Sequence, residues 1–428
     1  MSPLAARVRR TYLVLVAGNT LAASFIWGIN TLFLLDAGLT NVEAFTANAF
    51  FTAGMVLFEV PTGVVADGWG RRISYLLGTV VLAIGTALYL ALWWWHSPFW
   101  AWAAVSVLLG LGFTFFSGAV EAWLVDALRF AGYSGGLEPV FGRAQVVGGA
   151  AMLVGAMGGG LIAQVTNLGV PYLLRVGVLL VMTVVAAVAM KDLGFAPDRT
   201  VSAGAAMRAI VVASVRYGLR RPPVRWLMVS GAFLSGVGIF AFYAMQPYLL
   251  RLYGDTSAYW VAGLAAAVLA GSQMVGGMLA APLRRRVRRR TSALLAGAVV
   301  GAALLLGLGL AGSFVLAVAL LVLLGLFQAA VTPVRQAYLN DLVPSGQRAT
   351  VLSFDSLLSS AGGVVVQPAL GRVADLQGYG ASYLVGAAIQ LGALPFLALS
   401  RASGGAADRS VTPDEPAPPQ LGTDPEPG

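Results

Sequence analysis

Long apolar segments recur along the whole chain and constrain its fold more than any other feature. A helix needs about 20 mostly apolar residues to cross the hydrocarbon core of a bilayer. Of the 428 residues, 58% are hydrophobic and 11% are charged, which is too apolar for a soluble domain. Twelve segments qualify: 11–35, 41–66, 73–95, 99–125, 143–165, 170–190, 224–250, 258–282, 291–311, 313–337, 349–371 and 381–400. The chain is therefore predicted to be an all-α membrane protein with twelve transmembrane helices.

The twelve segments form two groups of six. A polar stretch separates residues 1–190 from residues 224–400, so we predict an N-terminal and a C-terminal six-helix half. The connecting stretch 191–223 contains apolar and basic residues at helical spacing, which predicts a cytoplasmic bridge with an amphipathic helix on the membrane surface. Residues 401–428 are rich in Pro, Asp and Glu and lack apolar periodicity, so we expect a disordered cytoplasmic tail.

The distribution of arginines predicts the orientation in the membrane. Cytoplasmic loops carry an excess of Lys and Arg. If the N-terminus is cytoplasmic, most arginines, including the run 284–290, fall in cytoplasmic segments. Arg175, Arg251 and Arg372 then lie near the outer ends of the helices. We interpret those three as snorkelling side chains. Both termini are thus predicted to be cytoplasmic in a multi-pass protein of the cell membrane. The run 284–290 directly follows an apolar segment, so we expect it to contact lipid and not nucleic acid.

The residue types present exclude several kinds of chemistry. The chain has no Cys and a single His, His96, so disulfides, catalytic thiolates and Cys/His metal sites are excluded. We expect no metal and no cofactor. A polytopic membrane enzyme is the less favoured alternative, because the acidic residues at the membrane boundary fit gate positions better than a catalytic site.

Short motifs recur in the same order in the two halves. Gly63-Val-Val-Ala66 recurs as Gly277-Met-Leu-Ala280, and Tyr172 matches Tyr383. Gly160-Leu-Ile-Ala-Gln164 likewise recurs as Gly371-Arg-Val-Ala-Asp375. A duplicated six-helix unit is typical of transporters whose halves surround a central binding site. The repeat therefore favours a transporter over a receptor or scaffold.

The connection between the second and third apolar segments carries a recognisable motif. It is Glu59-Val-Pro-Thr-Gly63-Val-Val-Ala-Asp67-Gly-Trp-Gly70-Arg71-Arg72. This motif resembles the loop signature between helices 2 and 3 of the major facilitator superfamily, whose twelve-helix members include drug-exporter-like permeases. With the spans and the repeat, the resemblance covers residues 1–400. It implies a secondary transporter that moves a small solute by alternating access, with Asp67 latching the two halves together on the cytoplasmic side.

The sequence departs from this family pattern at three places. The second copy of the motif has Ala281 where the first has Asp67. Proton-coupled drug exporters usually carry an Arg within helix 4, whereas the stretch 106–112 has none. Their helix-5 signature has Pro where this chain has Ala156. These departures weaken the resemblance to the drug–proton antiporters but not the resemblance to the superfamily.

Charged residues gather at the predicted cytoplasmic helix ends. We predict that they form a latch and an ion-pair gate that opens during transport, the alternative being a static charge cluster at the water boundary. The latch and gate candidates are Gly63, Asp67, Gly70, Arg71, Arg72, Glu121, Asp126, Arg143, Asp341 and Arg348.

Glu59 and Asp355 are the candidates for proton coupling. The helical rise of about 1.5 Å per residue places both acids at similar depth on faces that meet between the halves. Two carboxylates in a dry contact would share a proton, which would leave when the halves part. In the alternative, Asp355 pairs with Arg335, and Glu59 bonds backbone near Pro61.

The predicted centre of the bundle is aromatic and nearly uncharged. The substrate-cavity candidates are Trp27, Asn30, Phe113, Phe116, Phe240, Tyr243, Gln246, Gln328 and Thr332. Apolar pockets with a few polar groups suit an amphipathic or lipophilic solute; the alternative is that these side chains pack helices or face lipid. The sequence thus predicts a monomeric transporter, with small-molecule substrate, protons and lipid as partners, that performs proton-coupled efflux as an antiporter. An importer or facilitator of a small metabolite is the alternative.

Overall fold

The computed structural model describes residues 2–197, 204–205, 207–208, 212, 214–286, 289–344 and 347–408. The regular elements in this part of the chain are helices, which confirms the predicted fold class. Much of the predicted amphipathic helix, part of the run 284–290 and most of the predicted tail lie outside the described residues.

The first half of the chain contains eight helices in the described residues. They are α1 (Pro3–Trp27), α2 (Asn30–Asp36), α3 (Asn41–Trp69), α4 (Arg71–Trp94), α5 (Phe99–Thr114), α6 (Ala119–Phe130), α7 (Glu138–Val165) and α8 (Gly169–Ala189). Two predicted spans are broken. The chain bends by 46° between α1 and α2. Gly118, with φ 66°, precedes α6 and ends the continuity with α5; its left-handed backbone explains why a glycine stands there.

The second half begins after a short π-helix, η1 (Ser214–Leu219). Its elements are α10 (Pro222–Tyr253), α11 (Tyr259–Arg286), α12 (Arg290–Gly309), α13 (Phe314–Leu342), α14 (Arg348–Leu391), α15 (Leu394–Ser403) and the 3-10 helix η3 (Gly405–Asp408). Ordered structure therefore continues past the predicted boundary at residue 400.

Helix α14 contains two consecutive spans. Its 44 residues would extend about 66 Å at the helical rise, far beyond the thickness of a bilayer. Gly378 interrupts it with φ 85° and ψ 170°. Of the described helices, ten are long and apolar enough to span a membrane, and the α1–α2 pair makes eleven. That count treats Thr350–Ser403 as one span, although Gly378 interrupts its helix.

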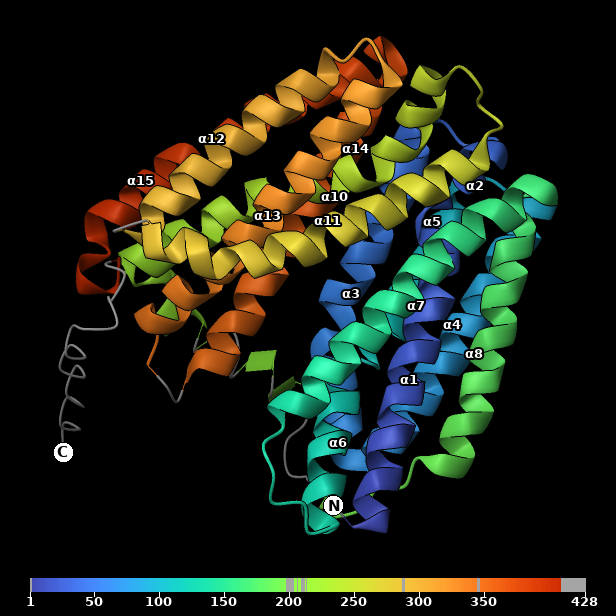
Figure 1. The fold of residues 1–428 in the computed structure, drawn as a ribbon, viewed down its shortest axis with the longest axis vertical. Coiled ribbons are helices and arrows are strands. Elements are labelled where there is room, and N and C mark those ends of the chain that lie inside the picture. Colours follow the sequence, from blue (N-terminus) through green and yellow to red (C-terminus); the bar gives the residue numbers. More distant parts are fainter. Residues whose placement is uncertain are drawn as a thin grey trace.

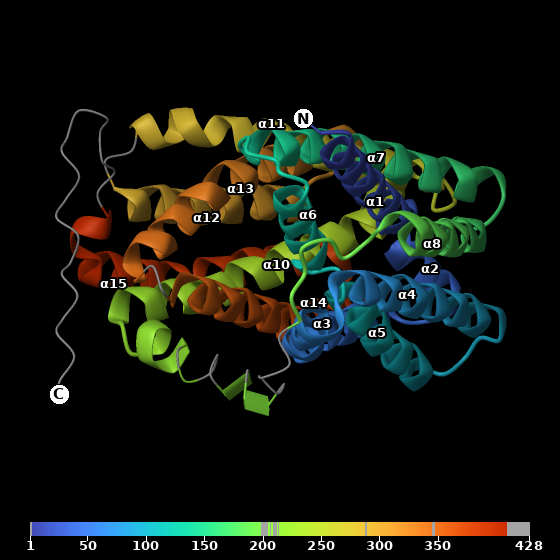
Figure 2. The same cartoon turned by 90° about the horizontal axis from the view of Figure 1, so that it is seen from below.

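The two halves lie side by side and touch at one end of the bundle (Figure 1). We call the end that holds the N-terminus the inner end, because the sequence predicts it to be cytoplasmic, and the opposite end the outer end. Helix α3 packs on α14, α7 on α11, and α2 on α10. Viewed from the inner end, the helices of the two halves occupy separate groups (Figure 2).

The apolar cores follow the same division. One core consists only of N-terminal-half residues and includes Val8 and Leu128, and another consists only of C-terminal-half residues. Toward the outer end the cores cross between halves, since Phe45 and Ala156 pack in one core with Leu370. Apolar burial therefore joins the halves toward the outer end and stabilises each half separately at the inner end.

Glycines allow α7 and α11 to approach closely. A Cβ atom on Gly160 would lie 2.8 Å from the Cα of Gly263, so a larger residue at either position would force the helices apart. Small residues at helix contacts are the usual means of tight packing within a membrane, where apolar burial between helices is a weak driving force.

Candidate functional site

A break in the first span forms the centre of the contact between halves. At the break, the backbone N–H of Thr31 donates to Oε1 of Gln246 over 2.8 Å, and Nε2 of Gln246 donates to the Trp27 carbonyl over 2.7 Å. The Thr31 hydroxyl also donates to the Tyr243 carbonyl over 2.9 Å. Gln246 belongs to α10 and is fully buried. Its amide thus satisfies one donor and one acceptor that the interrupted helix leaves free.

A second inter-half contact caps α3. The carboxylate of Asp375, on α14, accepts hydrogen bonds from the backbone N–H groups of Asn41 and Val42, each 2.9 Å long, and from the Asn41 side chain at 2.8 Å. Tyr379 donates to the Asn41 side-chain oxygen as well. A carboxylate is favoured at a helix N-terminus because of the unpaired N–H groups and the helix dipole.

The same contact occurs in weaker form with the halves exchanged. Oε1 of Gln164, on α7, accepts from the backbone N–H of Trp260 at the start of α11, over 3.4 Å. Gln164 and Asp375 are the matching residues of the sequence repeat. Neither was predicted to be functional, although the repeat contained this signal. In both halves the residue ends a helix and bonds the N-terminal turn of a helix in the other half.

All these hydrogen bonds between halves lie toward the outer end. They involve the α1–α2 break, the starts of α3 and α11, the end of α7 and the break in α14. Between described residues, no hydrogen bond joins the two halves at the inner end. Among these residues, polar contacts therefore join the halves at the outer end only.

Among the described residues, the ion-pair partner of the predicted latch residue Asp67 belongs to the same half. Asp67 forms an ion pair with Arg71 over 2.8 Å, and 54% of its side chain is exposed. A Cβ on Gly63 would meet no atom within 4 Å, so close packing does not require that glycine in this state. Gly70 differs, because its φ is 107° and a Cβ there would lie 2.4 Å from Oδ2 of Asp192.

Asp192 is a residue that the sequence reasoning missed. Its Oδ1 accepts from the backbone N–H of Arg72 over 3.0 Å and so caps α4. Burial raises the pKa of the Asp192 carboxyl above its usual value, against the opposing effects of the Arg72 N–H and the charges of Arg72 and Arg71. The polypeptide that follows the last helix of the N-terminal half is thereby tied to the latch motif.

The C-terminal half has the equivalent cap. Asp408 accepts from the backbone N–H and the hydroxyl of Thr291, both over 2.8 Å, and is 2% exposed. Residue 408 lies within the predicted tail. In each half, an aspartate beyond the sixth span therefore caps the helix that forms the third span.

The predicted ion-pair gate is not assembled in this structure. Within the described residues, Glu121, Asp126 and Arg143 take part in no ion pair, and Glu121 and Arg143 are exposed. In the other half, Asp341 pairs with Arg290 over 2.6 Å, whereas Arg348 donates to the Asn340 carbonyl over 3.0 Å. In this state Asp341 and Arg348 therefore have different partners, both within the C-terminal half.

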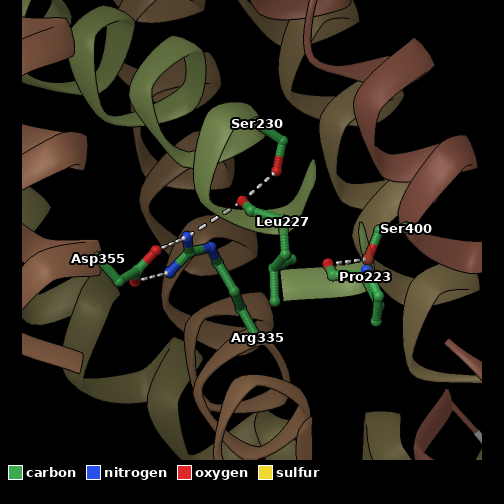
Figure 3. A network of polar contacts seen from close by, with 6 residues as sticks. All are labelled: Pro223, Leu227, Ser230, Arg335, Asp355 and Ser400. Atoms are coloured by element: carbon green, nitrogen blue, oxygen red, sulfur yellow. Dashed lines mark hydrogen bonds and ion pairs between the residues drawn. The ribbon is translucent and has the colours of Figure 1, made fainter. Parts of the chain in front are cut away.

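Asp355 pairs with Arg335 inside the C-terminal half (Figure 3). Both guanidinium Nη atoms lie 2.6 Å from the carboxylate, and Asp355 is 6% exposed. Nη2 also donates to the Leu227 carbonyl over 3.3 Å. A Cβ on Gly231 would lie 2.5 Å from that Nη2, so the glycine makes room for the arginine. This is the alternative arrangement considered for Asp355.

Glu59 has a different partner. The Ser117 hydroxyl, between α5 and α6, donates to its Oε1 over 2.6 Å. The predicted contact between Glu59 and Asp355 is therefore wrong for this structure, and so is the alternative contact of the Glu59 side chain with backbone near Pro61. Helical rise gives an expected depth for each acid, but it does not give the rotation of the helices that decides their partners.

The cavity candidates divide into two sets. Phe240 and Gln246 are buried, and so is Asn30, which accepts from the Tyr172 hydroxyl over 2.9 Å and donates to Asn48 over 2.9 Å. The others keep accessible surface: Gln328 and Thr332 are exposed, and Trp27, Phe113, Phe116 and Tyr243 are partly exposed. Of these candidates, only the second set has surface accessible in this state.

One of the three outer arginines differs from the prediction. Arg251 is exposed and lies 4.8 Å from the centre of the Tyr379 ring, and Arg372 is exposed. Arg175 is only 6% exposed, so it is buried within the bundle and does not snorkel.

Two helical halves with many helices long enough to span a membrane define a multi-pass membrane protein. A family model described as Major Facilitator Superfamily matches residues 12–306 and 261–423. The chain belongs to this superfamily of transporters, as its motif implied. No curated protein sequence matches it.

Solved structures share the fold at low sequence identity. The nucleoside transporter NupG superposes with a TM-score of 0.75 at 12% identity, covering 93% of this chain and 99% of that one. A mutant of the peptide transporter POT gives a TM-score of 0.71 at 15% identity, with coverage of 94% and 98%. A bacterial homologue of the human lysosomal transporter Spinster, described as inward-facing and unoccupied, gives 0.65 at 15% identity, with coverage of 96% and 98%.

Proposed function

We propose that the protein is a proton-coupled exporter of small amphipathic solutes that works by alternating access, and that this structure is its inward-open state. The observation that carries the proposal is the position of the hydrogen bonds between halves, which lie toward the outer end. A solute from the cytoplasm would then reach Gln328 and Thr332, two exposed polar residues of α13.

A rocking motion of the two halves would open the outer side of the bundle and close the inner side. Opening the outer side breaks the bonds of Gln246 and Asp375 to the N-terminal half, and closing the inner side brings the latch residues against the other half. The exposed carboxylate of Asp67 is free to take a partner on that half. The free energy lost at one end is offset by contacts formed at the other, as a reversible cycle requires.

The buried pair of Asp355 and Arg335 supports proton coupling. Both residues lie about 10 Å from the inner ends of their helices, given the helical rise. Protonation of Asp355 would cancel the ion pair and leave Arg335 without its buried counter-charge, which is costly and favours rearrangement of α13 against α14. Coupling would then use a pair within one half and not a carboxylate pair between halves.

The test uses purified protein in liposomes and an imposed pH gradient, with fluorescent amphipathic dyes as probes. Asp355→Asn should abolish uphill dye transport and retain dye exchange between equal pools. Asp255→Asn, at an exposed acid in the outer loop, serves as the matched control and should keep both activities. Uphill transport by Asp355→Asn would refute the coupling, and downhill flux alone in the parent protein would indicate a facilitator.

A further inference from the structure

Arg175 is a buried cation without a counter-charge. It lies in the second turn of α8, is 6% exposed, and takes part in no ion pair or side-chain hydrogen bond within the described residues. Its Nε is buried and has no hydrogen-bond partner. Arg290 is the other buried arginine of the described residues, and it pairs with Asp341. Charges inside a membrane protein are normally paired or face a functional cavity.

Three tyrosines surround Arg175 closely enough to interact with its charge: Tyr89, Tyr172 and Tyr243. Tyr89 shares a hydrogen bond with Ser106 over 2.5 Å, and Tyr172 donates to Asn30, so two of these hydroxyls are already engaged. Tyr243 comes from α10 of the other half and is partly exposed. Arg175 therefore lies where the two halves meet, next to a cavity candidate.

Comparison of the two halves shows whether the fold itself requires an arginine at the position of Arg175. Tyr172 and Tyr383 match, and both donate hydrogen bonds to the interior of the bundle. Three residues after each of them stand Arg175 and Gly386. The same fold is thus built in the second half without the arginine, although burying an unpaired charge is costly.

We propose that Arg175 recognises the negatively charged group of the transported solute. The solute is then an amphipathic monoanion, such as a carboxylate on an aromatic or aliphatic body. The single cation matches a single negative charge, and the aromatic rings around it match an apolar body. This inference rests on the proposed transport function and narrows the class of substrate. The cavity residues predicted from the sequence are uncharged and gave no reason to expect a charged solute.

The test measures binding by the purified full-length protein in detergent. The probes are a panel of aryl and alkyl monocarboxylates, 4-phenylbutyrate among them, each paired with its primary amide. The parent should bind at least one carboxylate tighter than its amide. Arg175→Gln should weaken that carboxylate by about ten- to hundredfold, the typical loss of a charge-assisted hydrogen bond, and leave the amide unchanged. Arg175→Lys should retain part of the preference.

Two controls separate recognition from folding. Arg251→Gln removes an exposed outer arginine and should alter neither affinity. Arg175→Met, without ligand, should unfold at the same temperature as the parent or higher, because it removes an uncompensated buried charge, whereas a structural arginine would leave the variant less stable. A carboxylate preference that survives Arg175→Gln, or its absence from the parent across the panel, would overturn the proposal. Dye transport by the parent would show that the transport function stands even then.

Discussion

The side chain of Gln246 accepts a hydrogen bond from the backbone N–H of Thr31, 2.8 Å away in the other half of the molecule. The same amide donates to the Trp27 carbonyl on the far side of the helix break. One residue therefore completes the backbone hydrogen bonding of an interrupted span and holds the two halves together. The bend in the first span and the closure of the outer end are, by this contact, a single feature.

Removing this contact should shift the protein toward an outward-open state. Gln246→Ala leaves two backbone groups without partners, each worth about 1–3 kcal/mol when buried. A shift of about 1.4 kcal/mol changes the ratio of states tenfold. Ala262→Cys, at a fully buried position near the start of α11, should then react faster with an impermeant maleimide added outside. The chain has no native Cys to interfere.

Gln390→Ala is the matched control for that experiment. Gln390 is also buried, but it donates to the Ala298 carbonyl within its own half. Its loss should cost stability without changing the labelling of the cysteine introduced by Ala262→Cys. Equal labelling in Gln246→Ala and Gln390→Ala would show that the Gln246 contact does not hold the outer end closed.

Asp67→Asn should separate transport from stability. The ion pair with Arg71 is largely exposed, and such pairs contribute about 0–1 kcal/mol. The unfolding temperature should therefore stay close to that of the parent. Transport should fall, because the outward-facing state loses its latch. The measurement is dye flux in liposomes beside thermal unfolding of the same preparation; full flux would refute the latch.

Gly70→Ala should destabilise the protein much more than Gly63→Ala. A side chain at Gly70 has to adopt a positive φ, at a cost of about 1–2 kcal/mol, and it collides with Asp192. Gly63→Ala meets open space and should gain up to about 1 kcal/mol of helix propensity. Thermal unfolding of both variants checks the difference. Similar losses at both sites would mean that the motif glycines act through packing in another state.

The pH dependence of Asp192 has a defined sign. Burial raises its pKa, so its contribution to stability is present below the unfolded-state pKa and is lost as pH rises through the folded-state pKa. Relative to Asp192→Asn, the parent should therefore become more stable as the pH falls from 7 toward 4. Asp192→Ala should lose the cap at every pH, by about 1 kcal/mol.

Asp255 provides the opposite sign as a control. Hydrogen bonds from the Ser257 hydroxyl and N–H lower the pKa of its carboxyl. Any advantage of the parent over Asp255→Asn should shrink as the pH falls. Unfolding temperatures of the parent and both Asn variants across this pH range test the pair. The same slope for both variants would contradict the assigned pKa directions.

The sequence predicted some residues of the site but not their partners. The motif identified Asp67, Gly70 and Arg71 as a group, because those residues are neighbours in the chain. Helical rise predicted that Glu59 and Asp355 lie at similar depth, but their partners proved to be Ser117 and Arg335. Depth is a local property of a span, whereas the partner depends on how far each helix is rotated against its neighbours.

The sequence by itself determined the membrane-spanning architecture, the two halves and the superfamily. These properties follow from apolar length, from a repeat and from a short motif, all of which act within a few dozen residues. Only the tertiary structure decided that Gln246 and Asp375 join the halves, that Asp192 and Asp408 cap helices, and that Arg175 is buried without a counter-charge. The physical reason is that these contacts join residues far apart in the chain or on different helices, and no local pattern encodes which faces of packed helices meet.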